Sequence, residues 1–147
     1  MINLQNILSR KAKYKAGEIA NRVMERFASR HSLPFISSYP PAVAACAQIG
    51  GDTYVSETKH VRREHVHQTL QMEIKNRLGY RIGEKSHYAS NSYVGYCAEP
   101  NAVNALLKHE RLNNLDDVYF GDTYRPRTGV VVPPCGNCQR MFKNVIR

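Results

Sequence analysis

Two short segments, each with a cysteine at the expected start of a helix, constrain this chain more than any other feature. Residues 97–100 read CAEP, and residues 134–138 read PCGNC. Cysteines three positions apart on the first turn of a helix can point at one ion, and a helix N-terminus favours thiolate over thiol. Thiolates are good ligands for zinc, which takes four ligands in a tetrahedron. The two segments therefore predict that Cys97, Cys135 and Cys138 meet around a Zn²⁺ ion.

The number of ligands distinguishes a catalytic zinc site from a structural one. No fourth cysteine or histidine lies at a matching spacing in the sequence, and three protein ligands with an open position are typical of catalytic zinc. Glu99, two residues after Cys97, is expected close to the ion without binding it. A carboxylate there can take a proton from activated water and pass it to a substrate nitrogen. Zinc-dependent nucleobase deaminases combine the same two motifs, so the pattern predicts this chemistry.

Two alternatives need no metal. Cys135 and Cys138 have the spacing of a redox pair and could form a disulfide. Glu99 could be an acid that only stabilises a helix N-terminus, with Cys97 as an ordinary core thiol. The zinc site is absent only if both alternatives are true, so the sequence favours the metal. Cys46, in an alanine-rich apolar run, is predicted to be a small buried core residue.

On these residues the chain resembles the cytidine deaminase superfamily, and more narrowly the YwqJ-type deaminase domains of bacterial polymorphic toxins. The resemblance is strong over residues 96–108 and 133–139 and weaker over residues 37–58. It implies an α/β fold, a three-layer α-β-α sandwich around a mixed sheet, with both motif helices on one side. It also implies Cys97, Cys135 and Cys138 as zinc ligands and Glu99 as the proton shuttle.

Two departures from the family pattern affect what it implies. The sequence ends nine residues after Cys138, whereas superfamily members usually add one or two strands after that helix. Three explanations stay open: the sheet lacks its last strands, a strand comes from upstream, or the chain has been cut. The order Cys-Gln-Arg over residues 138–140 reverses the Cys-Arg-Gln order of free-cytidine deaminases. This reversal weakens the transfer of free-nucleoside specificity.

The hydrophobic pattern divides the chain into two parts. Residues 1–35 are predicted to be a basic N-terminal helical segment, with Ile19, Val23 and Phe27 on one helix face. Residues 36–147 are predicted to be the zinc-dependent deaminase domain. Its expected elements are a helix over 41–48, a strand over 52–60, a helix over 62–78 ended by Gly79, an extended segment over 87–96, a helix over 100–111, a strand over 116–124, a loop with a short β segment over 125–134, and a last helix from about Cys135.

The charge of the chain points to a polyanionic partner. The formal net charge is +9, from 21 Lys and Arg against 12 Asp and Glu, which favours nucleic acid. Seven of these cations lie within residues 1–31, where they also fit a solvated helix face. No apolar run approaches the roughly 18 residues of a membrane span, and residues 1–15 contain no signal-peptide apolar region. The sequence therefore predicts a nucleic-acid partner and no membrane.

Five further residues are candidates for substrate contacts. Tyr88, Tyr93 and Tyr96 precede the first zinc ligand and could stack on a base, as aromatic residues do in single-strand binders. The alternative is that they are core residues of strand-like segments. Arg125 and Arg127, in the loop before the second motif, could contact phosphates. The alternative for them is a solvated loop.

Residues and resemblance together predict zinc-dependent hydrolytic deamination of a nucleobase in single-stranded DNA or RNA, with cytosine favoured over adenine. The resemblance implies a toxin effector domain, delivered as part of a larger toxin to the cytoplasm of the cell in which it acts. It also implies a cognate immunity protein. Two alternatives stay open. A deaminase of free nucleosides or nucleotides fits the all-cysteine ligand set but not the charge of +9. A non-catalytic zinc-stabilised nucleic-acid-binding module would keep every function without the carboxylate of Glu99.

Overall fold

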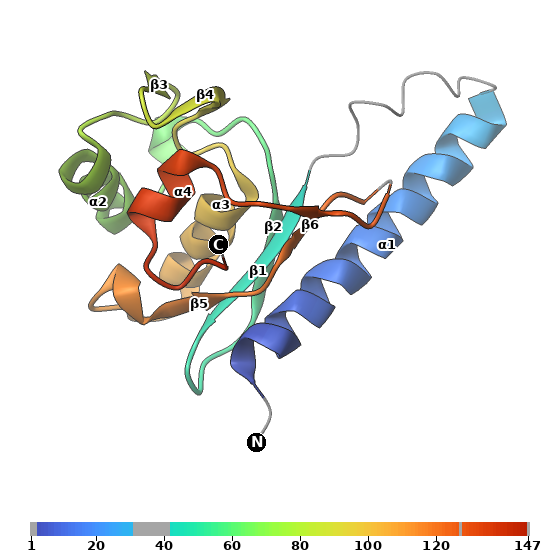
Figure 1. Ribbon diagram of the computed structural model, residues 1–147, viewed down its shortest axis with the longest axis horizontal. Helices are drawn as coiled ribbons and strands as arrows, with labels where there is room; N and C mark the ends of the chain where they lie inside the picture. The colour runs from blue at the N-terminus through green and yellow to red at the C-terminus, as the bar shows by residue number, and fades with distance from the viewer. Residues whose placement is uncertain (1–2, 31–41, 127, 147) are drawn as a thin grey trace.

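Helices cover both faces of an antiparallel sheet, so the α/β class predicted from the sequence is confirmed (Figure 1). The computed structural model describes residues 3–30, 42–126 and 128–146. The α-helices of this part are α1 (Leu4–Arg30), α2 (Gln68–Leu78), α3 (Ala98–His109) and α4 (Gly136–Met141). Its strands are β1 (Val43–Gln48), β2 (Tyr54–Glu57), β3 (Lys85–Ser86), β4 (Ala89–Tyr93), β5 (Val118–Phe120), β6 (Thr123–Tyr124) and β7 (Val131–Val132). None of the helices in these ranges is long and apolar enough to cross a membrane.

Strand β1 is the centre of the main sheet. It pairs antiparallel with β2 along one edge and with β5 and β6 along the other, and β7 pairs with β6. The predicted helix over residues 41–48 is therefore wrong for residues 43–48, and residue 41 lies outside the described part. The physical reason is burial on both faces. A strand covered on both sides lacks polar alternation, so its apolar run resembles a short buried helix.

Alternate residues of β1 face opposite layers, as the pleat of a strand requires. Val43, Ala45 and Ala47 pack against α1, which contributes Leu8, Ala12 and Ala16 to the same buried cluster. Cys46 belongs instead to the larger cluster formed by α2, α3, α4 and β5, and it is fully buried as predicted. Helix α1 thus shares a core with the central strand, and the side chains of Val23 and Phe27 lie outside the described part.

The other predicted elements are confirmed with changed boundaries. The helix predicted over 62–78 begins at Gln68, because His67 caps it by accepting from the Thr69 N–H, and it ends at Gly79 with φ +75°. The strand predicted over 116–124 is divided into β5 and β6 around Gly121. A Cβ on Gly121 would lie 2.1 Å from the Ser9 nitrogen of α1, so only glycine allows this close approach.

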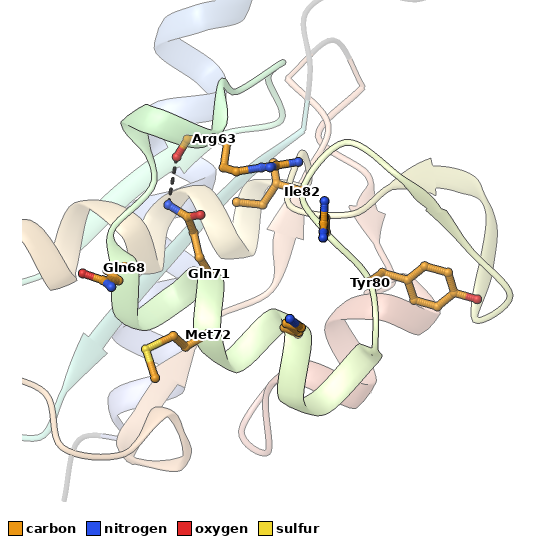
Figure 2. A pocket seen from close by; sticks show the side chains of 8 residues that line it. Arg63, Gln68, Gln71, Met72, Tyr80 and Ile82 are labelled. Atoms are coloured by element: carbon orange, nitrogen blue, oxygen red, sulfur yellow. Dashed lines mark hydrogen bonds between the residues drawn. The ribbon is translucent and has the colours of Figure 1, made fainter.

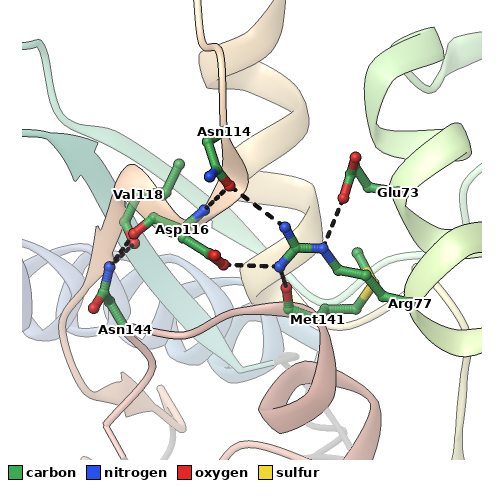
Figure 3. A network of polar contacts seen from close by, with 7 residues as sticks. All are labelled: Glu73, Arg77, Asn114, Asp116, Val118, Met141 and Asn144. Carbon is green, nitrogen blue, oxygen red and sulfur yellow. Dashed lines mark hydrogen bonds and ion pairs between the residues drawn. The ribbon is translucent and has the colours of Figure 1, made fainter.

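Arg77 of α2 joins three elements in one polar network (Figure 3). Its Nε lies 2.7 Å from Glu73 Oε2, and its Nη1 donates to Asp116 Oδ1 at 2.8 Å and to the Met141 carbonyl at 2.9 Å. Asn144 donates from Nδ2 to the carbonyls of Asp116 and Val118. The network fixes the end of α4 against α2 and the start of β5.

Replacing Arg77 with Met is expected to lower the free energy of unfolding by about 1–3 kcal/mol, because Asp116 and the Met141 carbonyl lose their partner. Urea titration of the purified protein measures this change. Lys75→Met, which removes an exposed cation from the same helix, is the matched control and should change stability by less than about 0.5 kcal/mol. Equal losses in the two variants would contradict the role of the network.

Candidate functional site

The structure brings the three predicted zinc ligands together. Cys97 Sγ lies 3.4 Å from Cys135 Sγ, which lies 3.7 Å from Cys138 Sγ, and all three sulfurs are within 4.8 Å of one another. A tetrahedral zinc with Zn–S bonds of about 2.3 Å has ligand sulfurs about 3.8 Å apart. The three cysteines could therefore hold a metal ion, and their spacing is compatible with zinc. All four cysteines of the chain are free thiols in the structure.

The backbone at two helix starts directs the sulfurs inward. Cys97 immediately precedes α3 and Cys135 immediately precedes α4, both as N-cap residues with extended backbone (φ −65°, ψ 162° and φ −69°, ψ 167°). Neither side chain makes a capping hydrogen bond, so both sulfurs remain available to an ion. Asn101 donates from Nδ2 to the Cys97 carbonyl at 2.9 Å, which holds the backbone of that ligand.

The three thiols share one negative charge. The pKa of Cys135 is lowered to about 2 by hydrogen bonds from Cys138 and Cys97, with help from the backbone N–H groups of Cys138 and Asn137. The hydrogen bond to Cys135 raises the pKa of Cys97 to about 12 and raises the pKa of Cys138 well above its ordinary value, because each thiol donates to the thiolate. A cation that binds here must displace the two remaining protons, so binding tightens as the pH rises.

Glu99 lies on the first turn of α3 and is only 5% exposed. Burial raises the pKa of its carboxyl to about 7, and the Cys135 thiolate adds to the rise. Hydrogen bonds from its own backbone N–H and from the Thr123 side chain act in the opposite direction. A carboxyl that only stabilised the helix N-terminus would gain nothing from this burial. A group that titrates near neutrality beside a candidate metal site is suited to proton transfer.

A cavity of about 10 Å³ borders Glu99 and has room for about one water molecule. Its walls include Thr123 of β6, Val132 of β7, and Val145 and Ile146 from the segment after α4. A nucleobase is much larger than this space. A base therefore cannot enter this cavity without a movement of the side chains that line it.

Asn137, between the two cysteines of the second motif, is a further site residue that the sequence reasoning did not identify. Its side chain is 4% exposed, and Ser86 Oγ contacts its Oδ1. The Tyr88 N–H donates to the same Ser86 oxygen, so the hydroxyl hydrogen is directed to Asn137. Its Nδ2 has no partner and borders a second cavity of about 10 Å³ beside Cys97 and Cys138. A buried donor there can bond to a thiolate or to one water.

The structure places the predicted substrate-contact residues at different positions relative to the three cysteines. Tyr96 precedes Cys97 directly, and the Tyr88 carbonyl packs on Gly136, where a Cβ would lie 1.8 Å from that oxygen. Tyr93, at the end of β4, is 47% exposed. Arg125 is exposed on the turn between β6 and β7, and Arg127 lies outside the described residues.

Comparison of the chain with protein-family models, with curated proteins and with solved structures finds no match. What the site does must therefore be inferred from its own geometry. That geometry contains three sulfurs at zinc-compatible spacing, a buried carboxyl and an unpartnered amide donor.

The chain is expected to bind one zinc ion, and Cys135→Ala should weaken zinc binding by at least about 100-fold, because one of three ligands is lost. Competition with a chromophoric chelator measures the affinity. Cys46→Ala is the matched control, since Cys46 lies outside the sulfur cluster, and it should bind zinc like the wild type. Unchanged zinc affinity in Cys135→Ala would disprove the site.

In the metal-free protein, Glu99→Gln is expected to raise the free energy of unfolding above that of the wild type by more at pH 8 than at pH 4. Burial makes the folded chain hold the Glu99 proton more tightly than the unfolded chain, whose pKa is 4.5. The folded wild type therefore loses stability as the pH rises from about 4.5 to about 7, and glutamine removes this loss. The gain in the free energy of unfolding of Glu99→Gln over the wild type should be about 3 kcal/mol larger at pH 8 than at pH 4.

Urea titrations with chelator and reductant, at pH 4 and pH 8, measure this difference. Glu64→Gln, at an exposed position before α2, is the matched control. A stability difference between wild type and Glu99→Gln that does not change with pH would contradict the burial argument.

Proposed function

We propose that this chain is a zinc-dependent nucleobase deaminase of the cytidine deaminase superfamily that acts on a polynucleotide. The observation that carries the proposal is the meeting of Cys97, Cys135 and Cys138, from two helix starts, with the buried Glu99 on the same helix as Cys97. A catalytic zinc needs three protein ligands and a nearby proton carrier, and these four residues provide both.

The fold supports this assignment at the level of layers. Helix α1 packs on one face of β1, whereas α2, α3 and α4 share the core on the other face. This arrangement fits a three-layer α-β-α sandwich with both motif helices on one side. The described strand ladders are antiparallel, whereas the resemblance implies a mixed sheet. One isolated parallel bridge joins Asn144, after α4, to Tyr119 of β5.

The proposed reaction replaces the exocyclic amine of a base with the oxygen of water and releases ammonia. Zinc, held by the three cysteines, supplies Lewis-acid activation of water. The Glu99 carboxylate accepts a proton from the attacking water and delivers it to the ring nitrogen beside the amine-bearing carbon, C4 of cytosine or C6 of adenine. A nearby cation favours the ionised carboxylate, so Glu99 starts in the form that can accept a proton.

The residues around the sulfurs counter their charge. Three thiolates around a divalent ion leave a net charge of about −1, which weakens the activation of water. The nearby backbone N–H groups of Asn137 and Cys138 help to lower the pKa of Cys135, and the Nδ2 of Asn137, which has no partner, is available as a further donor. Such donors reduce the charge on the sulfurs and so favour water activation.

The charge of +9 supports a polynucleotide substrate over a free nucleoside. Cytosine is proposed over adenine, since the resemblance is to cytidine deaminases, although both bases suit the same metal chemistry. The resemblance also supports a role as a toxin effector domain that a larger toxin delivers into the cytoplasm of a target cell. A cognate immunity protein would then be its protein partner.

Glu99→Gln should reduce deamination by at least about 100-fold, because the general acid–base is removed. The zinc-loaded protein would be incubated with single-stranded DNA, duplex DNA, RNA and free nucleosides. Sequencing and mass spectrometry then detect C-to-U or A-to-I conversion. Glu64→Gln, at an exposed acid outside the site, is the matched control and should keep full activity.

Three results would contradict parts of the proposal. Conversion of free nucleosides alone would assign the chain to nucleoside metabolism. Equal turnover by wild type and Glu99→Gln would remove the proton-shuttle role. Absence of any conversion with zinc bound would favour a zinc-stabilised nucleic-acid-binding module.

A further inference from the structure

We infer that the β3–β4 hairpin and its neighbours form a binding face for a single-stranded polynucleotide. The inference rests on the proposed function, because it takes the substrate to be a polymer. The face consists of two rows of aromatic rings, each ending in a cation. The first row is His60, Tyr96, Tyr93 and Lys85; the second row is Tyr80, His87, Tyr88 and Arg140.

The first row is continuous and is open to solvent at both ends, whereas Tyr96 between them is half-buried against the core. Ring centroids lie 4.7 Å apart for His60 and Tyr96 and 5.6 Å apart for Tyr96 and Tyr93. Lys85 Nζ lies 5.2 Å from the Tyr93 ring, across the β3–β4 ladder in which these two residues are paired. Tyr93 is 47% exposed, and His60 and Lys85 are also exposed. Rings that served only as a hairpin core would be buried, so this exposure favours a binding role.

The second row connects the hairpin to helix α4. Tyr80 Oη lies 2.7 Å from His87 Nδ1, and the rings of His87 and Tyr88 are 4.0 Å apart. The Arg140 guanidinium of α4 lies over the Tyr88 ring at 4.5 Å. A cation on a ring face adds attraction for the ring and leaves its charge available to a phosphate.

Both rows are attached to the residues that hold the sulfurs. Tyr96 of the first row is joined directly to Cys97, and Tyr88 of the second row packs its carbonyl on Gly136, next to Cys135. The backbone of each row is therefore joined to, or packed on, the segment that holds a sulfur. This placement is what a deaminase needs in order to present one base of a polymer.

Cations continue the face beyond the second row. A hollow of about 240 Å³ is lined by residues from the turn before α2, from α2 itself and from the loop after it (Figure 2). Arg63, Lys75 and Arg81 are among its lining residues, together with Tyr80 of the second row. These cations suit the phosphates that follow a stacked base, since phosphate contacts supply most of the non-specific affinity for nucleic acids.

Paired bases are already stacked inside a duplex, whereas the bases of a single strand can stack on protein rings. The chemistry of the face therefore selects single strands. Because the face contains several rings, it can contact several nucleotides of one strand. A free nucleoside can make only one of these contacts.

The test measures binding of a fluorescent 12-mer of thymidylate and of uridylate, at one fixed salt concentration. Neither base has an exocyclic amine, so binding is observed without any reaction. Tyr93→Leu should weaken binding of these 12-mers by between about 5- and 100-fold, whereas Tyr93→Phe should bind like the wild type because it keeps the ring.

The matched control is Tyr14→Leu, which removes a tyrosine that is 72% exposed on α1 and belongs to neither row. It should leave the affinity unchanged, and so should Tyr93→Leu for a duplex of the same length. His60→Leu, which removes another ring of the first row, should weaken single-strand binding in the same range as Tyr93→Leu. Zinc content and the thermal unfolding midpoint show that each variant is folded.

The outcomes separate this inference from the proposed reaction. Wild-type affinity in both Tyr93→Leu and His60→Leu, or an equal loss in Tyr14→Leu, overturns the binding face even if the protein deaminates nucleic acid. A loss specific to the row variants supports the face even if no deamination is found.

Discussion

Burial of β1 on both faces is the constraint on which the rest of the structure depends. Residues 43–47 are at most 1% exposed, and all except Val43 and Cys46 are alanines. Small side chains let α1 and α3 approach the same strand from opposite sides. Because α3 is held there, its N-terminus places Cys97 and Glu99 at a fixed point beside the sheet. Helix α4 is then fixed against that point by the Arg77 network and by the contact of Gly136 with the Tyr88 carbonyl.

The meeting of Cys97, Cys135 and Cys138 could be predicted from the sequence, whereas the surroundings of the three sulfurs could not. Cys97, Cys135 and Cys138 are defined by local spacing at helix starts, which short-range rules describe. Strand β1 was misassigned because a strand buried on both faces has no alternation to recognise. The pairing of His60 with Tyr96, and of Asn137 with Ser86, depends on how distant segments pack. No spacing in the sequence contains that information, so Tyr96 could be named as a candidate from the sequence but these two pairings were found only in the fold.

Proton affinities in the site are linked to one another through burial. One thiolate is stabilised by two thiol donors, and Glu99 is held protonated to about pH 7 by its low exposure and by that thiolate. A cation among the sulfurs would release thiol protons and favour the ionised carboxylate together. In our proposal, metal binding therefore also places Glu99 in the state that catalysis requires. Without the metal, ionisation of the buried Glu99 lowers the stability of the folded protein. The stability of the site therefore depends on whether the metal is bound.

In our proposal, the reaction and the choice of substrate depend on different parts of the chain. The space beside Glu99 is about 10 Å³ and is lined by Val145 and Ile146 among others, so a base must displace side chains to enter it. A polymer held on the two aromatic rows brings binding free energy from nucleotides that do not react, and this energy can offset the displacement. A free nucleoside has no such additional contacts. In our proposal, the small size of this cavity and the exposed rings of the two rows together favour a polynucleotide, for a reason independent of net charge.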